Sequence, residues 1–295
     1  MISAAEVAEQ VEGLPPFSAS VASLLRALQD PKVTATEIER IMRPDPALAV
    51  QLLKLANSGY YGGRGRIVTV RDAVVRLGTQ AVFGLASSAA LSQVVPAQLP
   101  GYQTTAEAFL QHSVGVAVFA GAIARSAARD VAGTAFTAGL LHDLGKLVIG
   151  VFLGRREAEL LERLDADGLT LLASERAVLG TDHCEVGRAV CRKWQLPELI
   201  AEVAEHHHEP EGAGGARART LCHVVHVADG AAHLFGLGND VGGLHRELRP
   251  ESLTALGLSP AALEVLAADV VGEVHDLLGS MAGAGEGPRL AAVPA

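Results

Sequence analysis

Apolar residues recur at intervals of three and four along almost the whole chain, and this spacing limits the possible fold more than any other feature. In the segment 105–127, Phe109, Val116, Phe119 and Ile123 fall on one helical face. No segment shows the alternation with a period of two that marks a half-buried strand. Ala, Leu, Glu, Arg and Gln, which favour helices, are abundant. The sequence therefore predicts an all-α protein.

Prolines and glycines divide the predicted helices into two lobes. Short helices are expected at 18–30, 34–43, 45–57, 70–78 and 79–95, and longer ones at 105–127, 133–153, 183–194, 196–207, 217–235 and 259–279. The segment 94–105 contains two prolines and a glycine and is the best internal boundary. We predict a leader at 1–13, a helical lobe at 14–100, a second helical lobe at 101–279 and a disordered tail at 280–295.

Charge and leader composition exclude several classes of protein. The net charge is −9, and neither lobe offers the broad basic surface that binding to a phosphate backbone requires, so nucleic acid is not expected as the main ligand. The N-terminus lacks the basic and apolar regions of a signal peptide, and no apolar run is expected to span a membrane. The three cysteines form no CxxC pair, which suits a reducing compartment and predicts a cytoplasmic location.

The run AGLLHDLGKLVIG, residues 138–150, places charged side chains in an apolar segment. Burying a charge without a partner costs several kcal/mol, so these side chains need something to bind. On a helix of 3.6 residues per turn His142 and Asp143 lie about 100° apart, so that both side chains can reach one metal ion. Lys146 would lie on the same side, where an ammonium group is a poor metal ligand but a good phosphate contact or proton donor.

Further candidate ligands lie on the apolar faces of other predicted helices of the second lobe: His112, His183, His207 and Asp229. All 11 histidines of the chain lie beyond position 111. Imidazole suits borderline transition metals, a carboxylate can bridge two cations, and helix bundles often build such sites from facing helices. The second lobe is therefore the predicted place for a metal centre.

Each candidate also has a structural interpretation that is simpler when the residue is taken alone. His142 and Asp143 could form a buried pair, and Asp229 could pair with His226 or His233 at helical spacing. The run 206–208 could be a solvated helix end, where histidine suits the helix dipole. Five inward-facing candidates in one lobe outweigh these separate explanations.

Long motifs, in order, resemble the HDOD domain, a relative of the HD metal-dependent phosphohydrolases and of HD-GYP proteins, over about residues 14–235. The first lobe carries LPPFSASVASLL, IMRPDPALAVQLLKLANSGYYG and VRDAVVRLG, and the second carries GLLHDLGKLVI, TDHCEVGRAVCRKWQLPELI, HHHEP and HVADGAAH. The resemblance implies a multi-helix bundle and a site for one or two divalent ions of Fe, Mn, Zn or Mg.

Carried over by position, the resemblance assigns a first set of ligands: His112, His142, Asp143 and Asp229. A second set would comprise His183, His207 and His208, with Asp143 bridging two ions and Lys146 acting with Asp143 in catalysis. Helical periodicity favours His207 within the triple histidine, and the HHEP match favours His207 with His208 over His206.

The resemblance implies two alternative functions. One is a bacterial signal-transduction protein with a retained metal site that hydrolyses a phosphoester or cyclic nucleotide. The other is a non-catalytic regulatory module that binds a protein partner or a nucleotide, because many HDOD proteins have lost these ligands. The Gly-Tyr-Pro signature of HD-GYP proteins is absent, and Ala108 stands where some relatives have an acidic residue. Hydrolysis of cyclic di-GMP is therefore not favoured.

Overall fold

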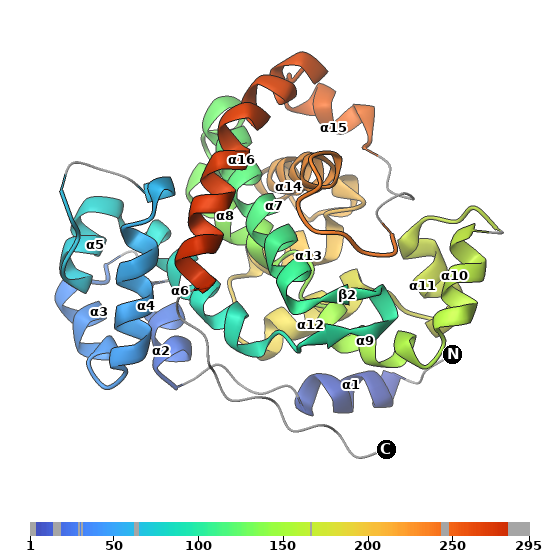
Figure 1. Cartoon of the computed structure of the whole chain (residues 1–295), viewed down its shortest axis with the longest axis horizontal. Coiled ribbons are helices and arrows are strands. Elements are labelled where there is room, and N and C mark those ends of the chain that lie inside the picture. The colour runs from blue at the N-terminus through green and yellow to red at the C-terminus, as the bar shows by residue number, and fades with distance from the viewer. Residues whose placement is uncertain are drawn as a thin grey trace.

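The computed structural model describes residues 4–13, 19–28, 30, 32–61, 65–165, 167–242 and 248–282. Most of the predicted tail, residues 283–295, lies outside these ranges. The predicted all-α class is confirmed, since helices make up nearly all the regular structure that is described. Figure 1 shows helices α2 to α5 gathered at one side of the molecule, with the longer helices beside them.

The first part of the chain forms six α-helices and a short 3₁₀ helix within the described residues. They are α1 (Ala4–Gly13), α2 (Ala19–Ala27), α3 (Ala35–Met42), α4 (Pro46–Ala56), η1 (Gly59–Tyr61), α5 (Val70–Leu77) and α6 (Thr79–Val94). Capping side chains start several of them. Thr34 accepts a hydrogen bond from the Glu37 backbone N–H, and Asp45 accepts one from that of Leu48.

The second part begins with a small hairpin and continues as longer helices. Its elements are β1 (Gln98–Leu99), η2 (Pro100–Tyr102), β2 (Thr104–Thr105), α7 (Ala106–Ala127), α8 (Ala132–Leu141), α9 (Lys146–Gly154), α10 (Glu157–Asp165), α11 (Leu171–Leu179), α12 (His183–Lys193), α13 (Glu198–His206), η3 (Pro210–Gly212), α14 (Ala216–Leu234), α15 (Pro250–Ala255) and α16 (Pro260–Ala282). Helices α10, α11 and α15 were not predicted.

The hairpin corrects the expectation that no strand is present. Strands β1 and β2 are antiparallel, with Gln98 opposite Thr105 and Leu99 opposite Thr104. A ladder of two residues per strand is too short to show a period of two in the sequence. Between the strands, Tyr102 is fully buried. Part of the segment that we expected to be a boundary is therefore packed into the protein.

The prediction of one helix over 133–153 is wrong, because residues 142–145 form a turn between α8 and α9. The Leu144 N–H donates to Leu141 O, and the Lys146 N–H donates to Asp143 O, which tightens the chain to three-residue hydrogen bonds. A Cβ atom on Gly145 would lie 1.8 Å from the backbone oxygen of His183. The turn can therefore approach the start of α12 only because residue 145 is glycine.

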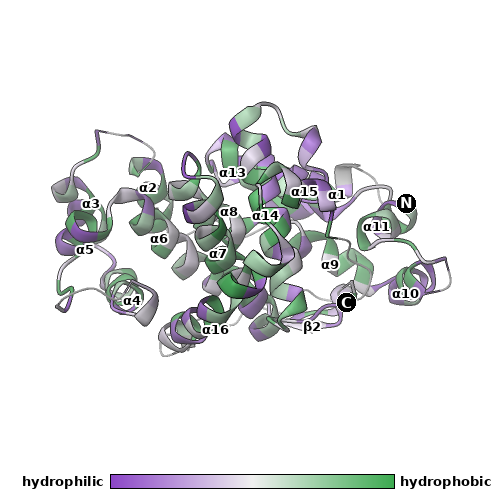
Figure 2. Ribbon diagram, turned by 90° about the horizontal axis from the view of Figure 1, so that it is seen from above, coloured by the Kyte–Doolittle hydropathy of each residue, from purple (hydrophilic) through white to green (hydrophobic). Residues whose placement is uncertain are grey.

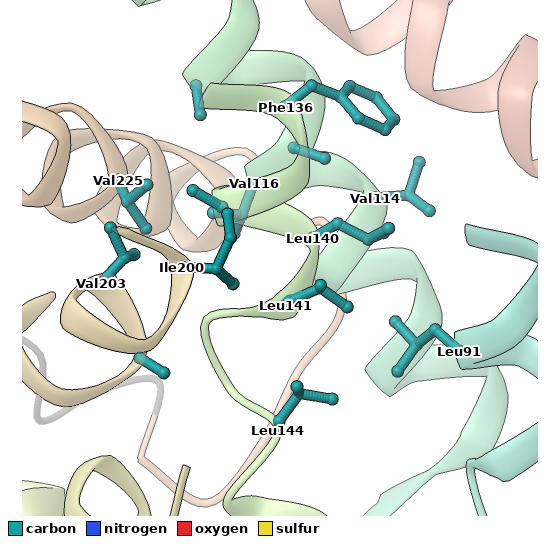
Figure 3. Close-up of a cluster of buried hydrophobic side chains, with 14 of the residues drawn as sticks. Leu91, Val114, Val116, Phe136, Leu140, Leu141, Leu144, Ile200, Val203 and Val225 are labelled. Atoms are coloured by element: carbon teal, nitrogen blue, oxygen red, sulfur yellow. The ribbon is translucent and has the colours of Figure 1, made fainter. Parts of the chain in front are cut away.

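Helix α8 lies at the centre of the core and contacts α6, α7, α13 and α14. Figure 3 shows buried side chains of α8, of the turn after it and of the helices that contact it: Leu91, Val114, Val116, Phe136, Leu140, Leu141, Leu144, Ile200, Val203 and Val225. In Figure 2 the apolar parts of the helices concentrate in this interior. The charged turn that follows α8 is thus carried by a largely buried helix at the centre of the bundle.

Two segments are long and apolar enough to cross a membrane by length and composition alone, which differs from our expectation of none. They are Ala106–Ala127 and Ala132–Gly154, and 67% and 89% of their apolar windows are buried inside the protein. Such burial is typical of core helices. We therefore interpret both segments as part of the core.

The first and last helices extend beyond the predicted lobes. Helix α1, in the predicted leader, contacts α9 and α12. Helix α16 contacts α7 but also α4 and η1 of the first lobe, and it includes residues 280–282 of the predicted tail. The division into two lobes remains a prediction: α1 joins the predicted leader to the second lobe, and α16 joins the second lobe to the first.

Candidate metal centre

The structure brings together all seven residues that were predicted as metal ligands, from five separate segments. Helix α7 contributes His112, the turn after α8 contributes His142 and Asp143, and the start of α12 contributes His183. The residues just after α13 contribute His207 and His208, and α14 contributes Asp229. Asp182 starts α12 by accepting the N–H groups of Cys184 and Glu185, which orients the first turn and its histidine.

A first group of side chains surrounds one oxygen of Asp143. The Nε2 atom of His142 lies 3.3 Å from Asp143 Oδ2, and that of His112 lies 3.8 Å from it. The same two nitrogens lie 3.8 and 3.0 Å from Asp229 Oδ1. The other ring nitrogen of each histidine lies near a backbone carbonyl. His142 Nδ1 lies 2.7 Å from Gly139 O, and His112 Nδ1 lies 3.3 Å from Leu237 O. If each Nδ1–H donates to its carbonyl, both Nε2 lone pairs face the carboxylates.

A second group surrounds the other oxygen of Asp143. The Nε2 atoms of His183 and His207 lie 3.5 and 3.7 Å from Asp143 Oδ1. His208 Nε2 lies 3.2 Å from His183 Nε2, so these two rings point toward a common position. By contrast, His206 turns to Glu205, with 3.4 Å between Nε2 and the carboxylate. Of the three consecutive histidines, His207 and His208 face the centre.

Asp143 therefore lies between the two groups, with one carboxylate oxygen toward each. Burial alone would raise its pKa, but His142 and the Lys146 ammonium outweigh this effect and hold the pKa well below its usual range. Asp143 is thus an ionised and fully buried carboxylate. This is the arrangement that a carboxylate needs in order to bridge two cations.

Buried polar atoms that lack a hydrogen-bond partner indicate whether these residues fit a metal. Among the residues that the structure describes, His142 Nε2, His207 Nε2 and Asp143 Oδ1 are buried without a hydrogen-bond partner. Each such atom costs about 1–3 kcal/mol in a dry interior. All three face the space between the ligand groups, where a cation would satisfy them. The set therefore fits a divalent metal.

Cys184 is near the second group, with its Sγ 3.9 Å from His207 Nδ1. Burial and the Asp182 carboxylate raise the pKa of this thiol well above its usual range. The sulfur also faces the side of the His207 ring that contacts the Val203 and Ala204 carbonyls. Cys184 is thus placed as a core residue behind a ligand.

Sequence reasoning missed Glu175, which supports His183. Its Oε2 accepts hydrogen bonds from His183 Nδ1 at 2.6 Å and from the His183 backbone N–H at 2.9 Å, while its Oε1 accepts one from Tyr102 Oη at 2.7 Å. Burial lowers the pKa of His183, but Glu175 outweighs this effect and the pKa is raised. The sequence did contain a signal that Glu175 is buried. Glu175 occurs at helical spacing with Leu171, Val178 and Leu179, on the apolar face of α11.

Asp240 was also missed, and it determines how Lys146 is held. The Lys146 Nζ lies 2.7 Å from Asp143 Oδ2 and 2.7 Å from Asp240 Oδ2, and 5.2 Å from the centre of the Tyr102 ring. Lys146 begins α9 and is almost fully buried. Asp240 lies in a glycine-rich stretch without periodicity, so no pattern in the sequence pointed to it.

With this geometry established, comparison with known proteins identifies the family. The profile of the HDOD domain matches residues 14–210, which is more than half of the chain. The chain belongs to the HDOD domain family. This confirms the resemblance on which the ligand assignment was based.

Two curated relatives of this HDOD protein are longer than the chain itself. An uncharacterised protein of Treponema pallidum is 24% identical over 206 residues, which are 70% of this chain and 39% of that protein. Ribonuclease Y of Thermus thermophilus is 33% identical over 104 residues, which are 35% of this chain and 13% of that protein. The chain thus spans well under half the length of either relative.

Solved structures share the fold over nearly the whole HDOD chain. An HDOD domain protein of unknown function from Geobacter sulfurreducens is 26% identical with a TM-score of 0.71, covering 96% of this chain and 98% of that one. A protein of Shewanella amazonensis, named provisionally as a phosphohydrolase, is 23% identical with a TM-score of 0.71, covering 94% and 98%. The similarity at these levels supports the helical architecture.

Proposed function

We propose that this HDOD protein is a cytoplasmic signal-transduction protein that binds one or two divalent ions and hydrolyses a phosphoester or a cyclic nucleotide. One observation carries the proposal: the two carboxylate oxygens of Asp143 face two separate groups of imidazole nitrogens. The names of two similar proteins agree with this reaction class. One is a ribonuclease and the other is provisionally a phosphohydrolase.

The metal ion and the side chains that hold it would have separate roles in the reaction. A bound divalent ion supplies Lewis acidity, lowering the pKa of a coordinated water and drawing charge from phosphoryl oxygens. Asp143 holds the two ligand groups in register, and the carbonyls behind His112 and His142 fix the orientation of both rings. This preorganisation would align a phosphoryl group without movement of the ligands.

Lys146 is the proposed source of positive charge and of a proton. Its ammonium group lies 2.7 Å from Asp143 Oδ2, beside the proposed metal centre. It could stabilise charge that develops on that oxygen or protonate the leaving oxygen. To do either, Lys146 has to exchange part of its contact with Asp240 for the substrate.

The test is hydrolysis by the full chain loaded in turn with Fe²⁺, Mn²⁺, Zn²⁺ and Mg²⁺. Substrates would include p-nitrophenyl phosphate, bis(p-nitrophenyl) phosphate, cyclic mononucleotides, cyclic dinucleotides and a short RNA. We expect metal-dependent turnover of at least one of them. The Lys146→Gln variant should keep its metal and lose most of the turnover. A metal-loaded protein that is inert toward the whole panel would refute hydrolysis.

A second candidate function is a non-catalytic regulatory module with a structural metal. It is favoured by the burial of the centre, because His142, Asp143, His183 and His207 are each at most 1% exposed and Lys146 is held between two carboxylates. On this alternative the first lobe binds a signalling protein or a nucleotide. Replacing His142 and Asp143 by alanine in the parent organism would then leave the phenotype unchanged, whereas a hydrolase would lose its function.

A further inference from the structure

His233 lies beside the metal centre, although neither the motifs nor the family comparison assigns it a role. It occupies the last turn of α14, four residues after Asp229 and on the same helix face. Its side chain is 8% exposed. The Nε2 atom of His233 lies 3.6 Å from Asp229 Oδ1, the oxygen that lies 3.0 Å from His112 Nε2. One ligand atom from each of these three residues lies within 4.8 Å of the others.

The end of α14 orients His112 and His233 together. The Gly236 N–H donates to His233 O, and the Leu237 N–H donates to Ala232 O. With Gly236 at a φ of 69°, these bonds form a Schellman motif that turns the chain back over the helix end. The carbonyl of Leu237 then lies 3.3 Å from His112 Nδ1. The same helix end therefore carries His233 and holds the ring of His112.

A role at the helix end does not by itself account for this geometry. A histidine in the last turn can stabilise a helix through its dipole, but an exposed side chain would serve for that, and burial of an imidazolium is costly. His233 instead pairs with Asp229, with 3.6 Å between Nε2 and Oδ1, which is longer than an N–H···O hydrogen bond. The rings of His112 and His233 have centroids 4.3 Å apart, and their Nε2 atoms lie 3.0 and 3.6 Å from the same carboxylate oxygen. This is the arrangement expected of ligands around a shared cation.

We propose that His233 is a further metal ligand, binding the same ion as His112 and Asp229. The inference rests on the proposed metal centre and specifies its ligand set. The group of His112, Asp229 and His233 would offer that ion two imidazoles and one carboxylate, and His112 also belongs to the group of His142 and Asp143. Imidazole nitrogen suits borderline transition metals, whereas Mg²⁺ prefers oxygen ligands. The ion expected at this position is therefore a divalent transition metal such as Fe²⁺, Co²⁺ or Zn²⁺, and not Mg²⁺.

A cysteine at position 233 would report direct contact with the metal. We would load the full chain carrying His233→Cys with Co²⁺ and record its absorption against the cobalt-loaded wild-type protein. A thiolate bound to Co²⁺ gives a charge-transfer band in the near ultraviolet, and the wild-type spectrum removes any contribution from Cys184. The matched control is His223→Cys, on the same helix, because His223 instead contacts Ser252 Oγ at 3.0 Å and Glu211 at 3.3 Å.

We expect the band in His233→Cys and not in His223→Cys. We also expect His233→Gln to bind Co²⁺ at least about tenfold more weakly than wild type, with an unchanged circular dichroism spectrum. Full cobalt occupancy of His233→Cys without the band overturns the inference, as does an unchanged affinity in His233→Gln. If the cysteine variant does not fold, the glutamine variant decides. A wild-type chain that takes up no cobalt refutes the metal centre itself, whereas absence of hydrolysis leaves this spectroscopic result standing.

Discussion

Glu175 and His183 are joined twice, since one carboxylate oxygen of Glu175 accepts hydrogen bonds from both the ring Nδ1 and the backbone N–H of His183. The contact fixes the position of the helix start and the orientation of the ring at once. It directs Nε2 toward Asp143, 3.5 Å away. Glu175 is therefore a positioning residue for the second group of ligands.

Replacing Glu175 by glutamine should weaken metal binding without removing a ligand. The amide keeps the shape of the side chain but loses the charge that sets the ring tautomer, so we expect the affinity for the second ion to fall about 10- to 100-fold. Calorimetric titration of the metal-free protein with Zn²⁺ measures the change in affinity. The control is Glu185→Gln, on the exposed side of α12 with Thr181 as its partner. Equal affinity in both variants would show that Glu175 does not orient His183.

Metal binding should stabilise the folded protein. At a free metal concentration about 100 times the Kd, binding to the native state alone adds about 2.7 kcal/mol to the free energy of unfolding. For a domain of this size that corresponds to a rise of about 5 °C in Tm. Thermal denaturation with metal and with a chelator measures the difference. The double variant His142→Ala, Asp143→Ala should show no shift, and a shift equal to that of wild type would place the metal elsewhere.

A methyl group at position 145 should separate the turn after α8 from α12. The added Cβ of Gly145→Ala would lie 1.8 Å from the His183 oxygen and 2.7 Å from the Gly187 nitrogen, both of which are backbone atoms. We expect a loss of at least about 1–3 kcal/mol in the free energy of unfolding, together with weaker metal binding, because His183 moves away from Asp143. Denaturant unfolding and metal analysis measure the two effects.

The matched control for that variant is Gly272→Ala in α16. Apart from the backbone of its own helix, no atom of the described residues lies within 4 Å of the Cβ that it would add. Alanine is the better helix former, so we expect a gain of about 0.5–1 kcal/mol. Wild-type stability and metal content in Gly145→Ala would show that the turn and α12 do not need this close approach.

The three thiols should react slowly in the folded protein, and faster as the pH rises. Burial raises the pKa of Cys191 and of Cys222 to about 12, and that of Cys184 well above its usual range. At pH 8 a thiol with a pKa of about 12 is ionised in only about one molecule in 10,000. A chromogenic disulfide reagent should therefore release little product from native protein and three equivalents after unfolding. Rapid release of even one equivalent from native protein would contradict this burial.

The same pKa shifts have a consequence for stability. The ordinary pKa of a thiol is near 9, so the folded protein holds these protons more tightly than the unfolded chain does. Their contribution to stability is complete below about pH 9 and is lost as the pH rises toward 12. Denaturant unfolding at several pH values, compared with a Cys191→Ala, Cys222→Ala variant, measures this loss.

Apolar periodicity, with prolines and glycines as boundaries, was enough to locate most helices of this fold. The stripe through Phe109 and Phe119 predicted α7, and the predicted range 183–194 matches α12. The break at residues 142–145 was missed because leucines surround it at helical spacing, while its cause, the close approach to α12, is a tertiary contact. The two-residue strands were missed because they are too short to show a period.

The residues that face the centre were predictable, but those that support them were only partly so. The predicted ligands occurred at helical spacing with apolar residues, or in motifs shared with the HDOD family. Glu175 had the same spacing, yet a single acidic residue in α11 did not reveal its contact with His183. Asp240 lies in a stretch without periodicity, so its contact with Lys146 became evident only in three dimensions.

Contacts between the two predicted lobes have a consequence for how the protein unfolds. Helix α16 packs against α4 and η1, and α8 packs against α6, so described helices on both sides of residue 100 share an interface. Unfolding of either side would expose surface that the other side buries. We therefore expect the two halves to melt together in one cooperative transition, rather than as two independent domains.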